Sequence, residues 1–148
     1  MKILVLSCDK NNDTFEPFHH CMEKYYPNHP EVIYATETVV NPYYKTICKN
    51  YPLEKWTKRI RETLYEIEDE QILLMVDDCF IRNPVNTKRI QYASDNLKGN
   101  IAMFNFEKAF DKSDIKSAIR GFNRRRHGSS YEVSLLCGLW DKKKLVKV

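Results

Sequence analysis

Two adjacent carboxylates, Asp77 and Asp78, follow a run of apolar residues in the segment QILLMVDDCFIRNP, which spans residues 71–84. The apolar run from Ile72 to Val76 is typical of a buried strand, so both acids lie where that strand ends. Neighbouring like charges repel each other, and a divalent cation offsets them, because Mg²⁺ and Mn²⁺ bridge carboxylates to phosphate oxygens. The alternative is that one aspartate caps the following turn while the other is solvated.

A second set of polar side chains follows the apolar segment KILVL near the start of the chain. Ser7, Cys8 and Asp9 come directly after this predicted strand. In open α/β sheets, ligands bind beyond the carboxyl ends of the strands. If the two strands are parallel, both sets of polar residues lie at the same edge of the sheet, where such proteins bind ligands.

Apolar periodicity predicts strands that alternate with helices along the chain. We expect strands at 2–7, 31–36, 71–76, 100–106 and 131–137, and helices at 13–26, 54–68, 87–97, 113–120 and in a short basic tail. The tyrosine-rich stretch 37–53 is expected to form a loop. This alternation predicts one α/β domain over residues 1–148, with a mostly parallel sheet and helices on both faces.

Two of these helices carry local signals. Asp13, followed three residues later by Glu16, resembles a capping box for the first helix. Trp56, Ile60 and Leu64 recur at helical spacing, so the segment 54–68 is expected to be amphipathic.

Length, composition and cysteine content restrict the class of protein. A chain of 148 residues with 43% hydrophobic and 30% charged residues fits one globular domain. No apolar run approaches the roughly 18 residues that a membrane span needs. The five cysteines, at 8, 21, 48, 79 and 137, form no C-x-x-C pair, which favours reduced thiols and a cytoplasmic protein.

Positive charge is concentrated near the end of the chain. Residues 112–148 carry a net charge of +7, whereas residues 1–111 carry −3. The stretch Arg124, Arg125, Arg126 and His127 could neutralise a diphosphate, or it could be a solvated basic face. Nucleic acid is a weaker candidate partner, because tyrosines 43, 44 and 51 could stack on bases but no recognised nucleic-acid motif accompanies them.

Four segments occur in an order that resembles a known family: VLSCDK, EKWTKRI, LLMVDDCFIRNPV and SLLCGLWDKKKL. Together they look like the N-terminal part of bacterial and phage glycosyltransferases of the GT-A fold, of the kind encoded beside polysaccharide genes. The acidic pair with its strand, phenylalanine and proline is the most specific piece. The resemblance implies a GT-A, Rossmann-like fold, a nucleotide-sugar donor and Mn²⁺ or Mg²⁺ as cofactor.

The resemblance also implies roles for individual residues. The acidic pair stands where the family has its D-x-D motif, so Asp77 and Asp78 would bind the metal, with Asp77 also near the nucleotide. The remaining nucleotide-binding positions fall on Ser7, Cys8, Asp9, Trp56 and Arg59, of which Arg59 could pair either with a carboxylate or with the nucleotide.

Members of this family continue past the segment that matches LW, so we expect a shortened protein that corresponds to the donor-binding part. With no recognised base motif, Glu107 and Asp111, after the strand at 100–106, are the candidate catalytic bases. Two alternatives stay open beside an active glycosyltransferase with an unknown acceptor. One is a phage-type binding protein without turnover that sequesters a nucleotide, nucleic acid or protein. The other is a metal-dependent phosphoryl-transfer enzyme.

Overall fold

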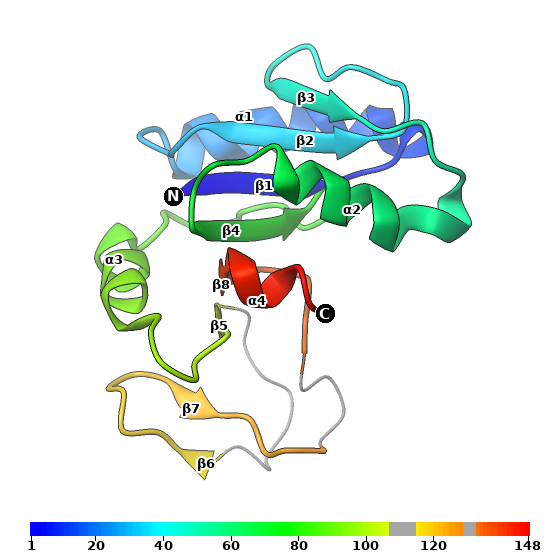
Figure 1. The fold of residues 1–148 in the computed structure, drawn as a ribbon. Coiled ribbons are helices and arrows are strands. Elements are labelled where there is room, and N and C mark those ends of the chain that lie inside the picture. Colours follow the sequence, from blue (N-terminus) through cyan, green and yellow to red (C-terminus); the bar gives the residue numbers. More distant parts are fainter. Residues whose placement is uncertain (107–114, 129–132) are drawn as a thin grey trace.

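A six-stranded sheet forms the centre of the molecule (Figure 1). The computed structural model describes residues 1–106, 115–128 and 133–148. The strand order is β3-β2-β1-β4-β8-β5, and β6 with β7 forms a separate two-stranded hairpin. The strands are β1 Lys2–Leu6, β2 Val32–Thr36, β3 Lys45–Cys48, β4 Gln71–Val76, β5 Met103–Asn105, β6 Ile115–Lys116, β7 Asn123–Arg124 and β8 Gly138–Asp141.

Most of the sheet is parallel, as the sequence predicted. β1 pairs in parallel with β2 on one side and β4 on the other, and β2 pairs in parallel with β3. β8 is the exception, because it runs antiparallel to both β4 and β5. The carboxyl ends of β1, β2 and β4 therefore lie at one edge, where the polar residues that follow them meet.

Helices cover both faces of the sheet, as Figure 1 shows. The helices are α1 Phe15–Tyr25, α2 Trp56–Tyr65, α3 Thr87–Asn96 and α4 Lys142–Leu145, with 3-10 segments η1 Asp9–Thr14 and η2 Leu53–Lys55. One buried cluster joins the sheet to α1 and α3, with Phe18 and Ala93 among its members. A second cluster joins the opposite face to α2 and α4, with Leu64 and Leu145 among its members. Burial on both faces explains why β1 and β4 are continuous apolar runs.

The expected loop at 37–53 contains a strand that the sequence analysis missed. Asn41 is buried, and its side-chain oxygen accepts hydrogen bonds from the backbone N–H groups of Tyr43 and Tyr44 at 2.8 and 3.1 Å. These bonds form a tight turn. After this turn the chain runs as β3, parallel to β2. A polar, tyrosine-rich stretch thus becomes an edge strand.

The expected capping box at Asp13 is wrong. Residues 9–14 already form the 3-10 segment η1, and the N-cap of α1 is Thr14, without a side-chain hydrogen bond. The Phe15 N–H donates to Asn12 O. Because the preceding 3-10 turn supplies this acceptor, the helix does not depend on a capping side chain for that group.

Two predictions in the last third are also wrong. Residues 115–120 form β6 and a turn instead of a helix, while residues 113 and 114 of that prediction lie outside the described part. The last strand is Gly138–Asp141, after the predicted 131–137, because Leu139 and Trp140 are the residues that enter the core. Residues 131 and 132 of that prediction lie outside the described part. A Cβ at Gly138 would lie 3.0 Å from Met103 Cε and 3.3 Å from the Phe104 backbone oxygen, so a larger residue at this position of β8 would require its neighbours in β5 to shift.

Within the described ranges, none of the helices combines the length and the apolar character that crossing a membrane would require.

Candidate functional site

The ends of β1 and β4 bring the two predicted polar sets together. Leu6 and Val76 are partners in the parallel register, and Asp77 N donates to Leu6 O at 3.2 Å. Ser7 and Asp77 are therefore neighbours although 70 positions separate them in the sequence. This edge of the sheet is the candidate functional site.

The carboxylate of Asp77 is used inside the protein. Its side chain is 4% exposed, Ser7 Oγ donates to Oδ2 at 2.6 Å, and Asn11 Nδ2 donates to Oδ1 at 3.4 Å. Burial raises the pKa of Asp77, and the hydrogen bonds from Ser7 and Asn11 act against that shift. Asp77 thus ties the end of β4 to the end of β1 and to η1.

Asp78 differs from its neighbour in every one of these respects. It is exposed, it lines the cleft at the strand ends, and it makes no hydrogen bond or ion pair with the described residues. A carboxylate in this setting keeps its acceptor capacity for a cation or for donors on a ligand. The pair therefore divides into one structural carboxylate and one available carboxylate.

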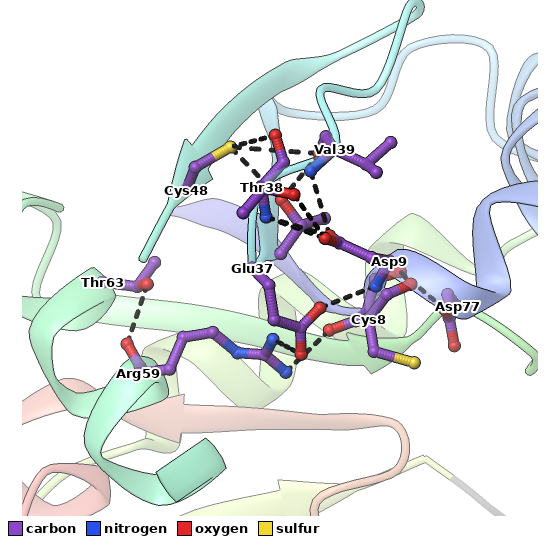
Figure 2. A network of polar contacts seen from close by, with 11 residues as sticks. Cys8, Asp9, Glu37, Thr38, Val39, Cys48, Arg59, Thr63 and Asp77 are labelled. Carbon is purple, nitrogen blue, oxygen red and sulfur yellow. Dashed lines mark hydrogen bonds and ion pairs between the residues drawn. The ribbon is translucent and has the colours of Figure 1, made fainter. Parts of the chain in front are cut away.

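Asp9 is also engaged, at the end of β2. Its carboxylate accepts hydrogen bonds from Thr38 N at 3.0 Å, Thr38 Oγ1 at 2.6 Å and Val39 N at 3.0 Å (Figure 2). Partial burial favours the neutral form, but the donors on Thr38 and Val39 prevail and lower the pKa of Asp9. The negative charge of Asp9 thus stabilises the turn that follows β2.

A buried arginine connects α2 with two strand ends. Arg59 is 6% exposed, and its Nη2 donates to Ser7 O at 2.9 Å. Its Nη1 forms an ion pair with Glu37, whose second oxygen accepts a hydrogen bond from Asp9 N at 2.6 Å. Figure 2 shows this chain of contacts from α2 through Glu37 to Asp9.

Sequence reasoning missed Glu37 and Asn11. Glu37 is the first residue after β2, so the rule that selected Ser7 and Asp77 at strand ends would have selected it too. Asn11 lies in η1, four residues after Ser7, and no sequence signal connects it with Asp77.

Two neighbouring clefts open at these strand ends and share Cys8. The first, of about 360 Å³, lies beside the acidic pair and is lined by residues that include Ser7, Cys8, Asn11, Trp56, Arg59, Asp77, Asp78 and Leu136. The second, of about 440 Å³, lies at the end of β2 and is lined by Cys8, Asp9, Lys10, Glu37, Thr38, Asn50, Tyr51 and Pro52. All six predicted nucleotide-binding residues line one of these clefts.

The basic stretch lies elsewhere in the fold. Arg124 belongs to the β6–β7 hairpin, and Arg125, Arg126 and His127 follow it. This hairpin packs on the sheet through Phe122, whose ring is 4.6 Å from that of Phe104. The four residues are absent from the described linings of both clefts.

The two candidate bases, Glu107 and Asp111, lie outside the described residues.

Comparison with known proteins identifies the fold. The chain is similar to the galactosyltransferase LgtC in complex with donor and acceptor sugar analogs, with a TM-score of 0.59 and 14% sequence identity. The match covers 100% of this chain and 60% of that chain, so this chain spans about three fifths of its structural neighbour. No family model matches the sequence, and no curated protein matches it. The fold is thus the expected GT-A, Rossmann-like α/β fold.

We predict a pH-dependent loss of stability in the variant Asp9→Asn. Because the pKa of Asp9 is lowered on folding, its charge stabilises the folded state above the ordinary value of 3.8, and this contribution disappears as pH falls through the lowered pKa. Urea unfolding at pH 7 should show a destabilisation of about 1–2 kcal/mol, which shrinks below pH 3.8. Asp13→Asn, an exposed change in the same 3-10 segment, is the control. A pH-independent difference would contradict the role of the charge.

Proposed function

We propose that the chain binds a nucleotide-sugar donor at the carboxyl ends of β1, β2 and β4 and acts in transfer of the sugar. The observation that carries this proposal is the available carboxylate of Asp78, beside a cleft with an aromatic wall at Trp56, in a GT-A fold. The structural neighbour was solved with donor and acceptor sugar analogs, and this supports the choice of ligand class.

The residues at the site fit a cation only if the ligand shares in binding it. Among the described residues, no group of three His, Cys, Asp or Glu side chains could hold a metal. Mg²⁺ and Mn²⁺ often bind through one or two carboxylates together with substrate phosphates, and Asp78 is available for such a bond. Bound in this way, Mn²⁺ or Mg²⁺ would act as a Lewis acid on the departing diphosphate.

The other predicted site residues then have distinct roles. Asp77, Asp9 and Arg59 shape the clefts, since their polar atoms are largely engaged in contacts within the protein. The larger cleft, with the ring of Tyr51 and the backbone around Thr38, offers space for the nucleoside. The smaller cleft, with Asp78 and Trp56, offers space for the diphosphate and the sugar.

The proposed reaction is displacement at the anomeric carbon of the donor. An acceptor hydroxyl oxygen forms the new bond to this carbon, and the bond to the diphosphate oxygen breaks with its electron pair on the nucleoside diphosphate. The hydroxyl proton passes to a base, for which Glu107 and Asp111 are the candidates.

Binding without turnover is the second candidate function. Of the four carboxylates at the strand ends, Asp9, Glu37 and Asp77 are engaged by neighbouring groups, so none of these three is available as a base. A protein that holds the nucleotide ligand without reacting would need only the contacts described above.

The two members of the acidic pair should respond differently to substitution by asparagine. Asp78→Asn should weaken Mn²⁺-dependent binding of UDP-galactose and GDP-mannose by about tenfold or more. The unfolding temperature should change little, because Asp78 is exposed and has no hydrogen bond or ion pair with any residue that the structure describes. Asp77→Asn should change the unfolding temperature more, because it alters a buried hydrogen-bond pair.

Isothermal titration calorimetry and thermal unfolding measure both effects. Asp95→Asn, an exposed change on α3, is the control. Metal-dependent binding that survives Asp78→Asn would overturn the assignment.

Turnover separates the two candidate functions. If the chain is a transferase, purified protein with Mn²⁺ should release nucleoside diphosphate from the donor, and Glu107→Gln or Asp111→Asn should abolish the release while donor binding persists. Chromatography of the nucleotide products measures this. Tight binding without release would leave the binding-only function.

The arginine stretch remains a candidate site for a diphosphate or another anion. Replacing Arg124, Arg125 and Arg126 by alanine should lower the affinity for pyrophosphate several-fold, since arginine binds phosphate oxygens through paired donors. Calorimetry measures the affinity, and thermal unfolding checks the fold. Unchanged affinity would assign the stretch to a solvated basic face.

A further inference from the structure

The hairpin formed by β6 and β7 carries positive charge that the proposed donor site does not use. This hairpin lies beyond β5, at the end of the sheet opposite β3 (Figure 1). The two clefts open instead at the carboxyl ends of β1, β2 and β4. Arg124 and the basic residues that follow it are absent from the described linings of both clefts. These cations are therefore placed to meet a different ligand.

The turn of the hairpin packs against the start of α3. Arg89 Nη2 donates to the Gly121 backbone oxygen at 3.2 Å. The same guanidinium lies 4.8 Å from the centre of the Phe122 ring. The helix and the hairpin thus form one continuous surface, which we call the α3–hairpin surface and define as residues 85–94 and 115–128.

The two segments of this surface contain basic side chains and no acidic ones. Residues 85–94 and 115–128 include seven Lys and Arg side chains and no Asp or Glu, whereas the whole chain has 24 basic and 20 acidic side chains. Lys88, Arg120 and Arg124 are exposed, and their side chains make no hydrogen bond or ion pair with the described residues. Five of the seven are arginines, whose planar guanidinium groups match phosphate oxygens. The surface therefore suits a ligand with several phosphate groups.

An exposed aromatic ring lies beside these cations. Tyr92 is 41% exposed and follows Lys88 by four residues in α3, so both side chains project from the same side of the helix. The Tyr92 ring makes no hydrogen bond or ring contact with the described residues. Proteins that bind single-stranded nucleic acids combine such rings, on which bases stack, with cations that contact the backbone. In a duplex the bases are already stacked on one another, so the ring favours a single strand.

A membrane surface is a poorer fit to the same charges. Proteins that lie in a membrane interface bury an apolar face among the lipids. In the hairpin, Ile119 and Phe122 pack against the protein core. Ile115 is the exposed large apolar side chain that the described hairpin offers to lipid. One such side chain provides little apolar area, so the charge and the exposed ring favour a nucleic acid.

We propose that the α3–hairpin surface binds single-stranded nucleic acid. Its phosphates contact Lys88, Arg120 and Arg124, and one of its bases stacks on Tyr92. This binding does not depend on the proposed sugar transfer, because the two ligands occupy different parts of the molecule.

Fluorescence anisotropy of dye-labelled oligonucleotides measures the binding by the 148-residue chain. The probes are oligouridylate, oligothymidylate and a DNA duplex, each of about 16 nucleotides per strand. Either single strand should bind more tightly than the duplex, and the ratio of the two single strands distinguishes RNA from DNA as the ligand. The logarithm of the affinity should fall with the logarithm of the salt concentration with a slope of about −2, because about three phosphates are neutralised.

The double variant Arg120→Ala with Arg124→Ala tests the phosphate contacts. It should weaken binding by about tenfold or more and change the salt slope to about −0.7, since two of the three phosphates lose their cations. The unfolding temperature should stay the same, because neither side chain has a partner among the described residues.

Substitutions on α3 test the stacking contact. Tyr92→Ala should weaken binding about tenfold at an unchanged salt slope, whereas Tyr92→Phe should retain the affinity, because the ring and not the hydroxyl stacks on the base. Lys88→Ala with Tyr92→Ala has a matched control in Arg61→Ala with Tyr65→Ala. The control pair is also an exposed cation and an exposed tyrosine four residues apart, on α2, and should bind as the unchanged protein does.

Four results would each overturn the proposal. The first is the absence of single-strand binding at low salt. The second is binding of poly-L-glutamate or of phosphatidylglycerol vesicles as tight as that of the oligonucleotides. The third is an equal loss in the α2 control and in the α3 variant, and the fourth is a preference for the duplex that Tyr92→Ala leaves unchanged. Binding of UDP-galactose and GDP-mannose with Mn²⁺, measured on the same variants, should not change, so each proposal can fail alone.

Discussion

Arg59 reaches from α2 across the carboxyl edge of the sheet, and the geometry of the site depends on where its charge is held. A buried guanidinium needs partners, because an uncompensated charge inside a protein costs several kcal/mol. Here the partners are the Ser7 carbonyl after β1 and the Glu37 carboxylate after β2. Through Glu37 the contact continues to the backbone of Asp9. One helix and two strand ends thus keep a common position, and the clefts form around them.

This arrangement explains why a cluster of acids can exist at one edge of the sheet. Asp9 is compensated by backbone and hydroxyl donors, Glu37 by Arg59, and Asp77 by Ser7 and Asn11. A carboxylate that is engaged by such partners is no longer available to bind a ligand. Asp78 is the member that remains, and its exposed position at the end of β4 gives it access to the cleft. The site therefore concentrates its available negative charge on one side chain.

The sequence predicted the parts of the fold that depend on local pattern. The buried strands β1, β2 and β4 were recognisable as short continuous apolar runs, and the amphipathic helix α2 was recognisable because its apolar residues recur at helical spacing. The strand β3 was not, because its position follows from hydrogen bonds made by the buried Asn41 side chain. Likewise, β8 was misplaced because its ends are set by pairing with β4 and β5, which lie far away in the sequence.

At the site, too, features that follow from local sequence pattern were predictable, whereas features that depend on contacts between distant residues were not. The rule that ligands bind beyond strand ends placed Ser7 and Asp77 at one edge, and the structure brings them within hydrogen-bond distance. The division of roles between Asp77 and Asp78 was not predictable, since it depends on the Asn11 side chain and on burial after folding.

The antiparallel position of β8 affects the order in which the chain can fold. β8 lies between β4 and β5, and Gln71 pairs with Asp141 in the register. Because β5 is held in the sheet by β8 alone among the described strands, neither can add to β4 until the residues of β8 have been synthesised. Pairing across so long a loop is slow, and an uncovered strand edge can associate with other chains in the meantime. We therefore expect the edge of β4 to be the part of the nascent protein most prone to aggregation before residue 141 leaves the ribosome.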